Sequence, residues 1–479
     1  MIKTPQTISL TTSPKKTFAI LLIGAFMALL DVTIVNVALP SIEHGINVST
    51  STLVWIVSGY ALTFGLVLIL SGRLGDRFGH KWTFLVGLSV FTLASLSCSL
   101  AQNSSDIIVS RLVQGIGAGF FSPAITSFIQ ILFTGKERSK AFGVYGAIVG
   151  LSTALGPLIG GLLIQAGGIH WGWRLVFLVN LPIGIITVPL AFLMLPETSD
   201  LGQKHNFDFI GLAILTIGLL LLLVPLVDGQ SAGWPLWSFI CLILAIPSFF
   251  LLWIWESHLD QLSKEPLITT RLLKQLHFAG GSLLAIVYFA AFTSIFFILS
   301  VLWQDGLNRS ALTTGFMIVP FALGSMISAS QSHKASAKLG RWVLVIGCFL
   351  VALGLFSLDI ILHFHNTNIK AGYIALPLVI AGIGNGLVIA PNQDFVLKSV
   401  KPNEIGSASG LLTTSQRVGT ALGIAAIGTV FFSSIHINSN HDLAQAFSHG
   451  AQVALIANTG LAITALVLVF LLPKKIPTE

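Results

Sequence analysis

Charged residues are scarce in this sequence. Only 9% of its 479 residues are Asp, Glu, Lys or Arg, whereas soluble domains carry roughly a quarter. More than half of the chain, 54%, is hydrophobic, and the mean hydropathy is +0.89. This composition excludes an ordinary water-soluble enzyme and indicates that most residues face lipid or each other.

Cysteine is also rare, and its positions suggest neither a disulfide nor a metal site. The three cysteines, Cys98, Cys241 and Cys348, lie in apolar runs with neither disulfide nor metal-ligand spacing. The sequence also lacks the Gly-rich loop with Lys and Ser or Thr that cradles the phosphates of ATP. We therefore expect no metal and no cofactor, and an energy source that is a gradient or the substrate itself.

Long apolar runs are what the sequence has in abundance. A helix of about 20 mostly apolar residues spans a bilayer, and fourteen such runs follow one another along the chain. The first run is too long for a secretory signal peptide, contains Asp31 and lacks a small-residue cleavage site. We predict an all-α, multi-pass membrane protein with spans near 18–39, 52–71, 82–101, 106–132, 140–166, 175–195, 209–227, 236–255, 277–303, 311–332, 342–362, 372–393, 405–433 and 451–472.

The basic residues predict the orientation of these spans. Twenty of the 25 Lys and Arg fall on one side together with both chain ends, whereas the loops of the other side contain only Arg174, Arg309 and Lys370. Basic loops stay in the cytoplasm, so we expect both termini to be cytoplasmic. The net charge of +7 then reflects topology and requires no nucleic-acid partner.

The runs are grouped as six, two and six. Polar connections predict a first bundle at 1–196, inner linkers with an extra helix pair at 197–270, and a second bundle at 271–479. The loop at 75–80 aligns with the loop at 336–341, and each lies between the second and third spans of its six. Related halves that flank a site at mid-membrane are typical of secondary transporters, although short basic loops with Gly also recur by chance.

The inner loop at 72–81 has the most specific pattern in the sequence. Its glycines permit a tight turn, and its carboxylate can pair with arginine or with a helix N-terminus. Such contacts could latch the inner side shut in one state; the alternative is a plain basic loop. The residues of this proposed gate are Gly72, Asp76, Arg77, Gly79 and Lys81.

The fifth run combines small residues with a proline. Small residues let helices approach closely, and proline bends a span. Generic helix packing would produce the same pattern. The residues are Gly150, Gly156, Pro157, Gly160 and Gly161.

These stretches resemble motifs of the major facilitator superfamily. The loop at 72–81 is similar to the family's inner-loop signature, with His80 where the family usually has arginine, and 111–117 is similar to its fourth-helix motif. The glycines of the fifth run resemble its antiporter motif, and 30–40 and 173–184 look like hallmarks of the fourteen-span drug:proton antiporter branch. The resemblance covers essentially the whole chain. It implies two six-helix bundles with a central inserted helix pair, working by alternating access.

Two charges fall at similar depth in the membrane, where charged side chains are costly and usually functional. Asp31 lies about 20 Å from the inner face and Arg111 about 22 Å, from the helical rise and the bilayer thickness. In the family that the sequence resembles, both of their spans line the cavity. We predict that Asp31 is the proton-coupling acid and Arg111 its modulator, because burial favours a protonated carboxyl and a guanidinium opposes protonation. The alternative is a fixed ion pair that joins two helices.

Other polar and aromatic residues of the spans are candidate walls of a substrate pocket. Amides can form hydrogen bonds there and aromatic rings offer apolar surface. Arg417 could line the pathway or, as we favour, reach the inner surface. The scarcity of acids suits bulky apolar or singly charged compounds better than multiply charged cations. The candidates are Asn36, Trp55, Tyr60, Gln114, Phe296, Trp303, Gln304, Asn385 and Arg417.

The expected function is export of hydrophobic drug-like compounds in exchange for protons, and the step to antiport rests on the resemblance. The expected partners are protons, a small hydrophobic or amphipathic substrate and the bilayer of the cell membrane, and we expect a functional monomer. A dedicated exporter of one endogenous lipid, siderophore or metabolite is the alternative. A membrane-embedded enzyme would need catalytic residues clustered at one depth, and the one close His pair, His363 and His365, has no partnering motif.

Overall fold

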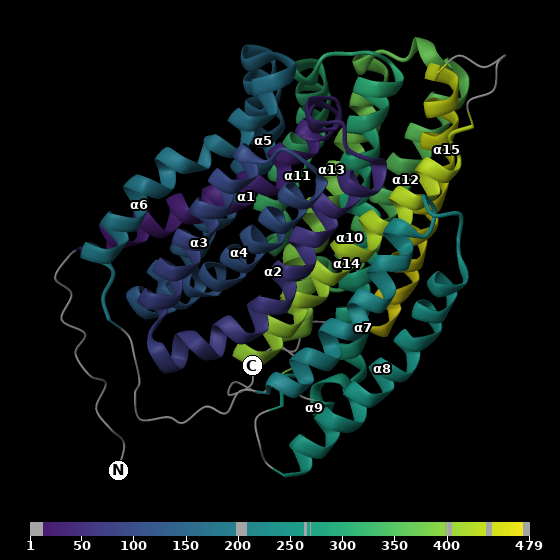
Figure 1. Ribbon diagram of the computed structural model, residues 1–479. Coiled ribbons are helices and arrows are strands. Elements are labelled where there is room, and N and C mark those ends of the chain that lie inside the picture. Colours follow the sequence, from purple (N-terminus) through teal and green to yellow (C-terminus); the bar gives the residue numbers. More distant parts are fainter. Residues whose placement is uncertain are drawn as a thin grey trace, which may run out of the picture.

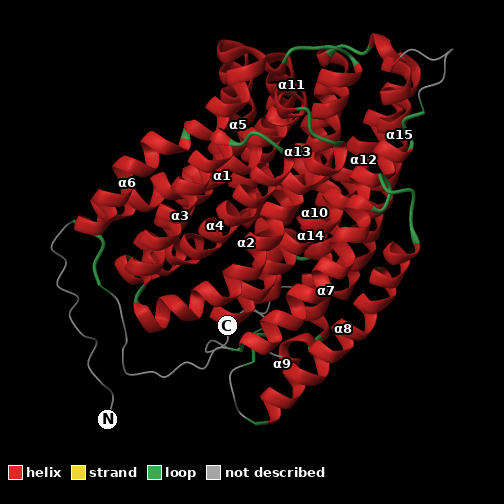
Figure 2. Cartoon of the chain, viewed as in Figure 1, coloured by secondary structure: helices red, strands yellow, loops and turns green. Residues whose placement is uncertain are grey.

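The computed structural model describes residues 13–197, 208–262, 266–268, 270–397, 400, 405–436 and 443–472. Across these residues every regular element is a helix (Figure 2). The prediction of an all-α fold is confirmed, and the helices follow the predicted runs closely. Helix ends extend past several predicted boundaries, because α-helices continue from the apolar core into the polar interface.

Six helices form the first bundle. Side chains fix where some of them begin: Ser49 accepts a hydrogen bond from the backbone N–H of Thr52 before α2, and Asn103 accepts one from that of Asp106 before α4. Gly168, with φ of +66°, interrupts α5, so this 44-residue element contains the fifth span and the start of the sixth. The helices are α1 (Pro14–Ile46), α2 (Thr50–Phe78), α3 (His80–Leu100), α4 (Ser104–Leu132), α5 (Gly135–Leu178) and α6 (Asn180–Met194).

The second bundle also has six long helices. α11 packs along α13, and α10 packs between α14 and α15. A π-helical turn, η1, extends α10 at the predicted outer end. The elements are α10 (Leu276–Val301), η1 (Leu302–Gly306), α11 (Ala311–Leu339), α12 (Trp342–His365), η2 (Asn366–Asn368), α13 (Ala371–Leu397), α14 (Ile405–Ser433), α15 (Leu443–Leu468) and η4 (Val469–Leu471).

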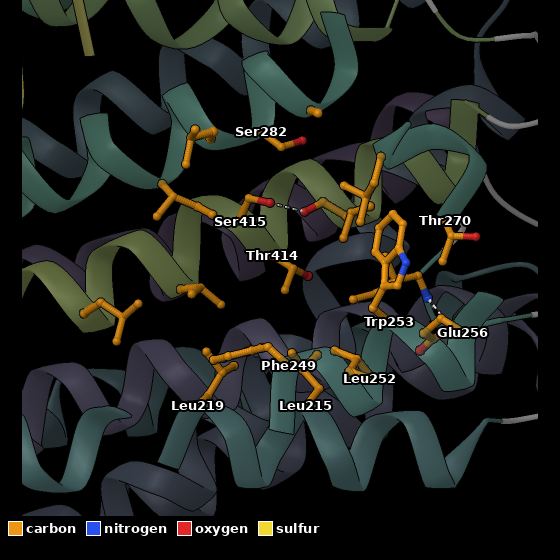
Figure 3. Close-up of a pocket in the computed structure, with 18 of the residues that line it drawn as sticks. Leu215, Leu219, Phe249, Leu252, Trp253, Glu256, Thr270, Ser282, Thr414 and Ser415 are labelled. Carbon is orange, nitrogen blue, oxygen red and sulfur yellow. Dashed lines mark hydrogen bonds between the residues drawn. The ribbon is translucent and has the colours of Figure 1, made fainter. Parts of the chain in front are cut away.

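The inserted pair lies on the flank of the molecule. α7 (Phe209–Asp228) and α8 (Leu236–Gln261) pack on each other, and α7 also contacts α2 and α14. Many large apolar side chains of α8 are exposed, as befits a helix that faces lipid. The short α9 (Thr270–Leu273) follows, and a cavity separates the pair from α10 and α14 (Figure 3).

Thirteen stretches of the described chain are long and apolar enough to cross a bilayer. The remaining predicted span, α14, is 29 residues long, but Gln416, Arg417 and several Gly, Ser and Thr make it less apolar. It packs along both α2 and α10 inside the molecule. A helix in that position needs little lipid-facing surface, so we assign α14 as the fourteenth span.

Hydrophobic packing joins the two bundles at one end. One core stays within the first bundle and contains edge-to-face contacts of Phe121 with Phe84 and Phe91. The other core runs from the predicted outer halves of α1 and α2 into the second bundle. The first bundle is therefore packed against the second through its outer half and against itself in its inner half.

The helices α5 and α11 pack on each other across the two bundles (Figure 1), and their glycines show the same asymmetry. A Cβ atom on Gly161 of α5 would lie 2.7 Å from Cα of Leu312 in α11, so the backbones touch at the predicted outer end. Toward the opposite end of α5, a Cβ on Gly143 or Gly146 would meet no atom of the described residues within 4 Å. The two bundles are therefore in backbone contact at the predicted outer end, which is the closed end in this structure.

Candidate functional site

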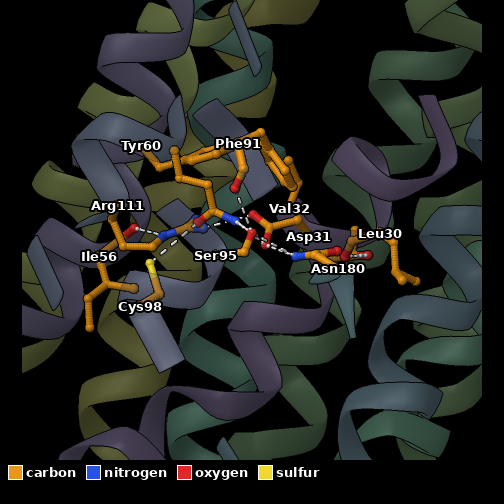
Figure 4. Close-up of polar contacts among 12 residues, drawn as sticks. Leu30, Asp31, Val32, Ile56, Tyr60, Phe91, Ser95, Cys98, Arg111 and Asn180 are labelled. Carbon is orange, nitrogen blue, oxygen red and sulfur yellow. Dashed lines mark hydrogen bonds and ion pairs between the residues drawn. The ribbon is translucent and has the colours of Figure 1, made fainter. Parts of the chain in front are cut away.

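Asp31 and Arg111 form an ion pair inside the first bundle. Arg111 Nη1 donates to Asp31 Oδ2 at 2.7 Å, which joins α1 to α4 (Figure 4). The side chains are 1% and 0% exposed. A buried pair of this kind avoids the larger cost of an isolated charge in an apolar interior. The structure therefore brings together the two charges that the sequence placed at similar depth.

Neutral amides complete the environment of the Asp31 carboxylate. Gln114 Nε2 donates to Asp31 Oδ1 at 2.9 Å, and Asn180 Nδ2 donates to the same oxygen at 3.1 Å. Ser95 of α3 accepts hydrogen bonds from both amides. Four helices, α1, α3, α4 and α6, thus meet at one carboxylate, and its ionised form has three donors around it.

Arg111 has partners besides Asp31. Its Nε donates to the backbone carbonyl of Ile56 in α2 at 3.0 Å, and its Nη1 also donates to Oε1 of Gln114. The guanidinium carbon lies 4.2 Å from the centroid of the Tyr60 ring, within cation–π distance. The guanidinium would therefore keep several contacts if the carboxylate lost its charge.

The predicted gate motif forms the junction of α2 and α3. Gly79 has φ of +95°, a conformation that favours glycine, and it joins the two helices. Gly72 and Gly75 lie within α2 instead of in the turn. The His80 ring packs so closely against Gly75 that a Cβ there would collide with it.

The charged residues of this motif lie at the same junction. The Lys81 ammonium is 5.3 Å from the ring centroid of Phe192 in α6, and the Arg77 guanidinium carbon is 5.2 Å from that of Phe78. The side chain of Asp76 lies outside the described residues. The latch therefore stays a prediction.

The glycines of the predicted antiporter motif face two different helices. A Cβ on Gly156 would collide with Thr33 of α1, and one on Gly160 would lie 2.9 Å from Cγ1 of Ile34. Gly161 faces α11, as does Gly150, whose Cβ position is 3.5 Å from Met326. Pro157 lies inside the helix, and its carbonyl oxygen packs against Gly315 of α11. α5 is therefore narrow on both faces and fits between α1 of its own bundle and α11 of the other.

The candidate pocket residues lie in several places instead of one. Tyr60 and Gln114 contact the pair, as described above, whereas Asn36 donates to the Val32 carbonyl of its own helix at 3.1 Å. Gln304 donates to the Val37 carbonyl at 3.0 Å and so joins the bundles at the predicted outer end, beside the buried Trp303. Trp55 instead donates to Asp228 of α7 at 3.1 Å and holds the inserted pair.

Two candidates belong to the interior of the second bundle. Tyr288 donates its hydroxyl to Oδ1 of Asn385 at 2.7 Å, and Asn385 Nδ2 donates to Ser325 at 2.9 Å. The Phe296 ring makes an edge-to-face contact with Phe321 at 5.0 Å between centroids. These contacts join α10, α11 and α13.

The interpretation favoured from the sequence placed Arg417 at the inner surface. In the structure Arg417 does not extend that far. Its guanidinium carbon lies 4.1 Å from the ring centroid of Phe64, in the middle of α2, and Gly65 packs against its side chain. Its Nε has no hydrogen-bond partner, and no carboxylate of the described chain forms an ion pair with it. Arg417 is thus a half-buried cation at the junction of the two bundles.

Several contacts of the candidate site and of the predicted outer end carry no signal in the sequence. Ser95 and Cys98 look like ordinary members of an apolar run, yet Ser95 joins the Asp31 network and Cys98 donates to Gln114 at 3.6 Å. His44 Nε2 lies 3.2 Å from Asp305 Oδ1 across the predicted outer end, and both residues sit at span ends where polar side chains are expected.

Two six-helix bundles that meet along paired helices, with a buried acid–arginine pair in one bundle, define a secondary transporter of the membrane. The chain belongs to the major facilitator superfamily, because the family model described as Major Facilitator Superfamily matches residues 21–424. This result confirms the resemblance of the motifs.

Relatives and solved structures agree with this assignment. The chain is 34% identical over 413 residues to the "Probable actinorhodin transporter" of Streptomyces coelicolor, covering 86% of this chain and 71% of the relative. It is 30% identical over 442 residues to the "Methylenomycin A resistance protein" of the same organism, covering 92% and 88%. The crystal structure of an auto-inhibited POT family peptide transporter shares the fold, with a TM-score of 0.66, 16% identity and coverage of 94% and 97%.

Proposed function

We propose that this protein exports hydrophobic drug-like compounds across the cell membrane in exchange for protons. The relatives named for an antibiotic and for antibiotic resistance support export. The observation that supports proton coupling is the buried ion pair of Asp31 and Arg111. We further propose a functional monomer with cytoplasmic termini and the division into 1–196, 197–270 and 271–479.

Protonation of Asp31 would be coupled to movement of Arg111. A neutral carboxyl no longer balances the guanidinium, and a buried unpaired charge is costly. Arg111 would then depend on the Ile56 carbonyl, Gln114 and the Tyr60 ring, all of which it already contacts. Proton binding would therefore favour a different arrangement of α1, α2 and α4.

α5 offers a path from this change to the other bundle. Thr33, two residues after Asp31, donates to the carbonyl of Ser152 in α5 at 3.3 Å, and Gly156 packs against Thr33. On its other face, α5 meets α11 at Gly161. We propose that α1 transmits the protonation of Asp31 through α5 to the outer contact between the bundles.

Arg417 would bias the substrates toward neutral or anionic compounds. Asp31 and Arg111 neutralise each other, so the described mid-membrane region has one net positive charge, that of Arg417. A cation at this depth attracts a carboxylate or phenolate and repels a cationic drug. Within the class of singly charged compounds expected from the sequence, we propose that the anionic ones are preferred.

Proteoliposomes with an acidic interior test the proposal. Neutral, anionic and cationic fluorescent aromatic compounds are added outside, and accumulation is followed with and without the pH gradient. We expect gradient-driven accumulation by the wild type and its loss in Asp31→Asn. Asp394→Asn is the control, because it makes the same substitution at a carboxylate that is 42% exposed, and it should change accumulation little. Equal rates for the wild type and Asp31→Asn would contradict the role of Asp31. A response to a single compound would instead favour a dedicated exporter.

A further inference from the structure

The inserted helix pair encloses a cavity that the transport mechanism does not use. The cavity has a volume of about 440 Å³ and lies between α7 and α8 on one side and α10 and α14 on the other (Figure 3). Leu219 of α7, Phe249 of α8 and Ser282 of α10 are among the residues that line it. Sites for drug-sized ligands in proteins range from about 300 to 1,000 Å³, so this volume suits a small organic molecule or part of a lipid.

Contacts at the predicted outer end hold the inserted pair in place. Asp228 accepts from Trp55, Ser51 donates to the Val227 carbonyl at 3.3 Å, and Thr429 of α14 donates to the Leu226 carbonyl. The cavity lies toward the opposite end of α7. The pair is thus attached at one end and spaced from the second bundle at the other.

The one acidic residue among those that line the cavity, Glu256, lies at one end of it, and the hydroxyl residues Ser282, Thr414 and Ser415 also contribute to its walls. Glu256 accepts from the backbone N–H of Ile268 at 3.2 Å near the predicted cytoplasmic end, and Thr270 lies beside it. From there the lining runs to Leu219 and Leu422 in the membrane interior. A molecule with a polar head and an apolar body would fit this mostly apolar lining with its head near Glu256, toward the cytoplasmic surface.

Ser282 is a polar residue of the cavity lining whose hydroxyl is unused. Its side chain is 95% buried, being 5% exposed, and its hydroxyl has no hydrogen-bond partner among the described residues. A buried hydroxyl without a partner costs free energy, and a ligand in the cavity could supply the missing bond. Rotation about the Cα–Cβ bond of Ser282 would turn this hydroxyl toward such a ligand.

The cavity also borders the lipid-facing surface. Leu283 of α10 and Trp253 of α8 line it, yet they are 45% and 39% exposed. A hydrophobic molecule dissolved in the bilayer would reach the cavity without crossing water. Tryptophan at such a position is suited to an amphipathic guest, because it offers an apolar ring and a polar N–H.

We propose that this cavity is a lateral binding site for an amphipathic molecule with an apolar body and a hydrogen-bonding head, taken up from the lipid leaflet at the predicted cytoplasmic side. Two sources have this chemistry: a membrane lipid and a hydrophobic compound that awaits export. The site requires neither proton coupling nor export, so its test is a binding test.

Photolabelling of the full-length protein in nanodiscs tests the site. The probe is a phosphatidylcholine with a diazirine in one acyl chain, and labelled residues are identified by mass spectrometry. Ser282→Phe and Leu219→Phe fill the cavity from opposite walls, so the test survives if one of them fails to fold by size-exclusion chromatography. Ile240→Phe, on an α8 residue that is 46% exposed and does not line the cavity, is the matched control.

We expect labelling of the cavity residues in the wild type and Ile240→Phe, and its loss in the folded cavity-filling variants. Excess Nile red, a neutral lipophilic dye, then separates the sources: displacement of the label identifies a site for drug-like compounds, and undiminished labelling identifies a lipid site. Labelling that is unchanged by both fillings, or spread evenly over lipid-facing residues, would overturn the proposal.

Discussion

Removing the charges of Asp31 and Arg111, singly and together, measures how far each depends on the other. The side chains are 0% and 1% exposed, and 2.7 Å separates Oδ2 from Nη1. Loss of one partner of a buried pair costs about 3–5 kcal/mol, because the other charge stays buried. We expect Asp31→Asn to lie near the lower limit, about 3 kcal/mol, since Arg111 keeps its hydrogen bonds to Ile56 and Gln114.

The double variant Asp31→Asn/Arg111→Gln has no buried charge and should recover most of this loss. Chemical unfolding of the detergent-solubilised proteins gives the free energy of unfolding for the wild type, both single variants and the double variant. Asp394→Asn, at an exposed acid, is the control and should change it by less than about 0.5 kcal/mol. If the two single losses add up in the double variant to within about 0.5 kcal/mol, the residues act independently and the reasoning is refuted.

Three further predictions concern the contacts between the bundles. Gly161→Ala should destabilise the outer-closed state by about 1–3 kcal/mol, because the new Cβ meets backbone atoms of α11. The accessibility of introduced cysteines from each side of the membrane would show this shift. Gly146→Ala, where the Cβ enters open space, should show none. Arg417→Gln should lower export of an anionic compound about tenfold or more relative to a neutral one, since a charge-assisted hydrogen bond contributes about 1.5–3 kcal/mol; equal losses for both compounds would exclude a role in charge selection. His44→Ala should change transport rates little, because His44 is 66% exposed and its pair with Asp305 is worth about 1 kcal/mol or less; a severe loss would show that this pair closes the outer end.

The sequence predicts the helical architecture well because the bilayer restricts it so strongly. Each span must be long and apolar, so the order and approximate limits of the spans can be read from the sequence. α14 shows where this signal weakens, since a span enclosed by α2 and α10 can carry Arg417 and many small polar residues. From the sequence it could be predicted only that Asp31 and Arg111 lie at a similar depth, and the structure shows that they are in contact.

The arrangement of the candidate pocket could not be predicted in the same way. Whether a side chain faces the partner bundle, its own bundle or the inserted pair depends on the rotation of each helix, which packing between distant segments decides. Trp55 illustrates this limit: it resembles a pocket wall in the sequence but donates to Asp228 of α7 in the structure. Arg417 illustrates it again, since its contact with Phe64 depends on how α14 lies against α2.

Proton release upon substrate binding tests proton coupling through Asp31 most directly. Detergent-solubilised protein in a weakly buffered solution with a pH-sensitive dye is mixed with a compound that the liposome assay has identified as a substrate, and binding is measured separately. We predict that binding releases protons from the wild type and that Asp31→Asn still binds the compound without releasing them. Undiminished proton release from Asp31→Asn, or binding to the wild type without any release, would contradict the proposed coupling.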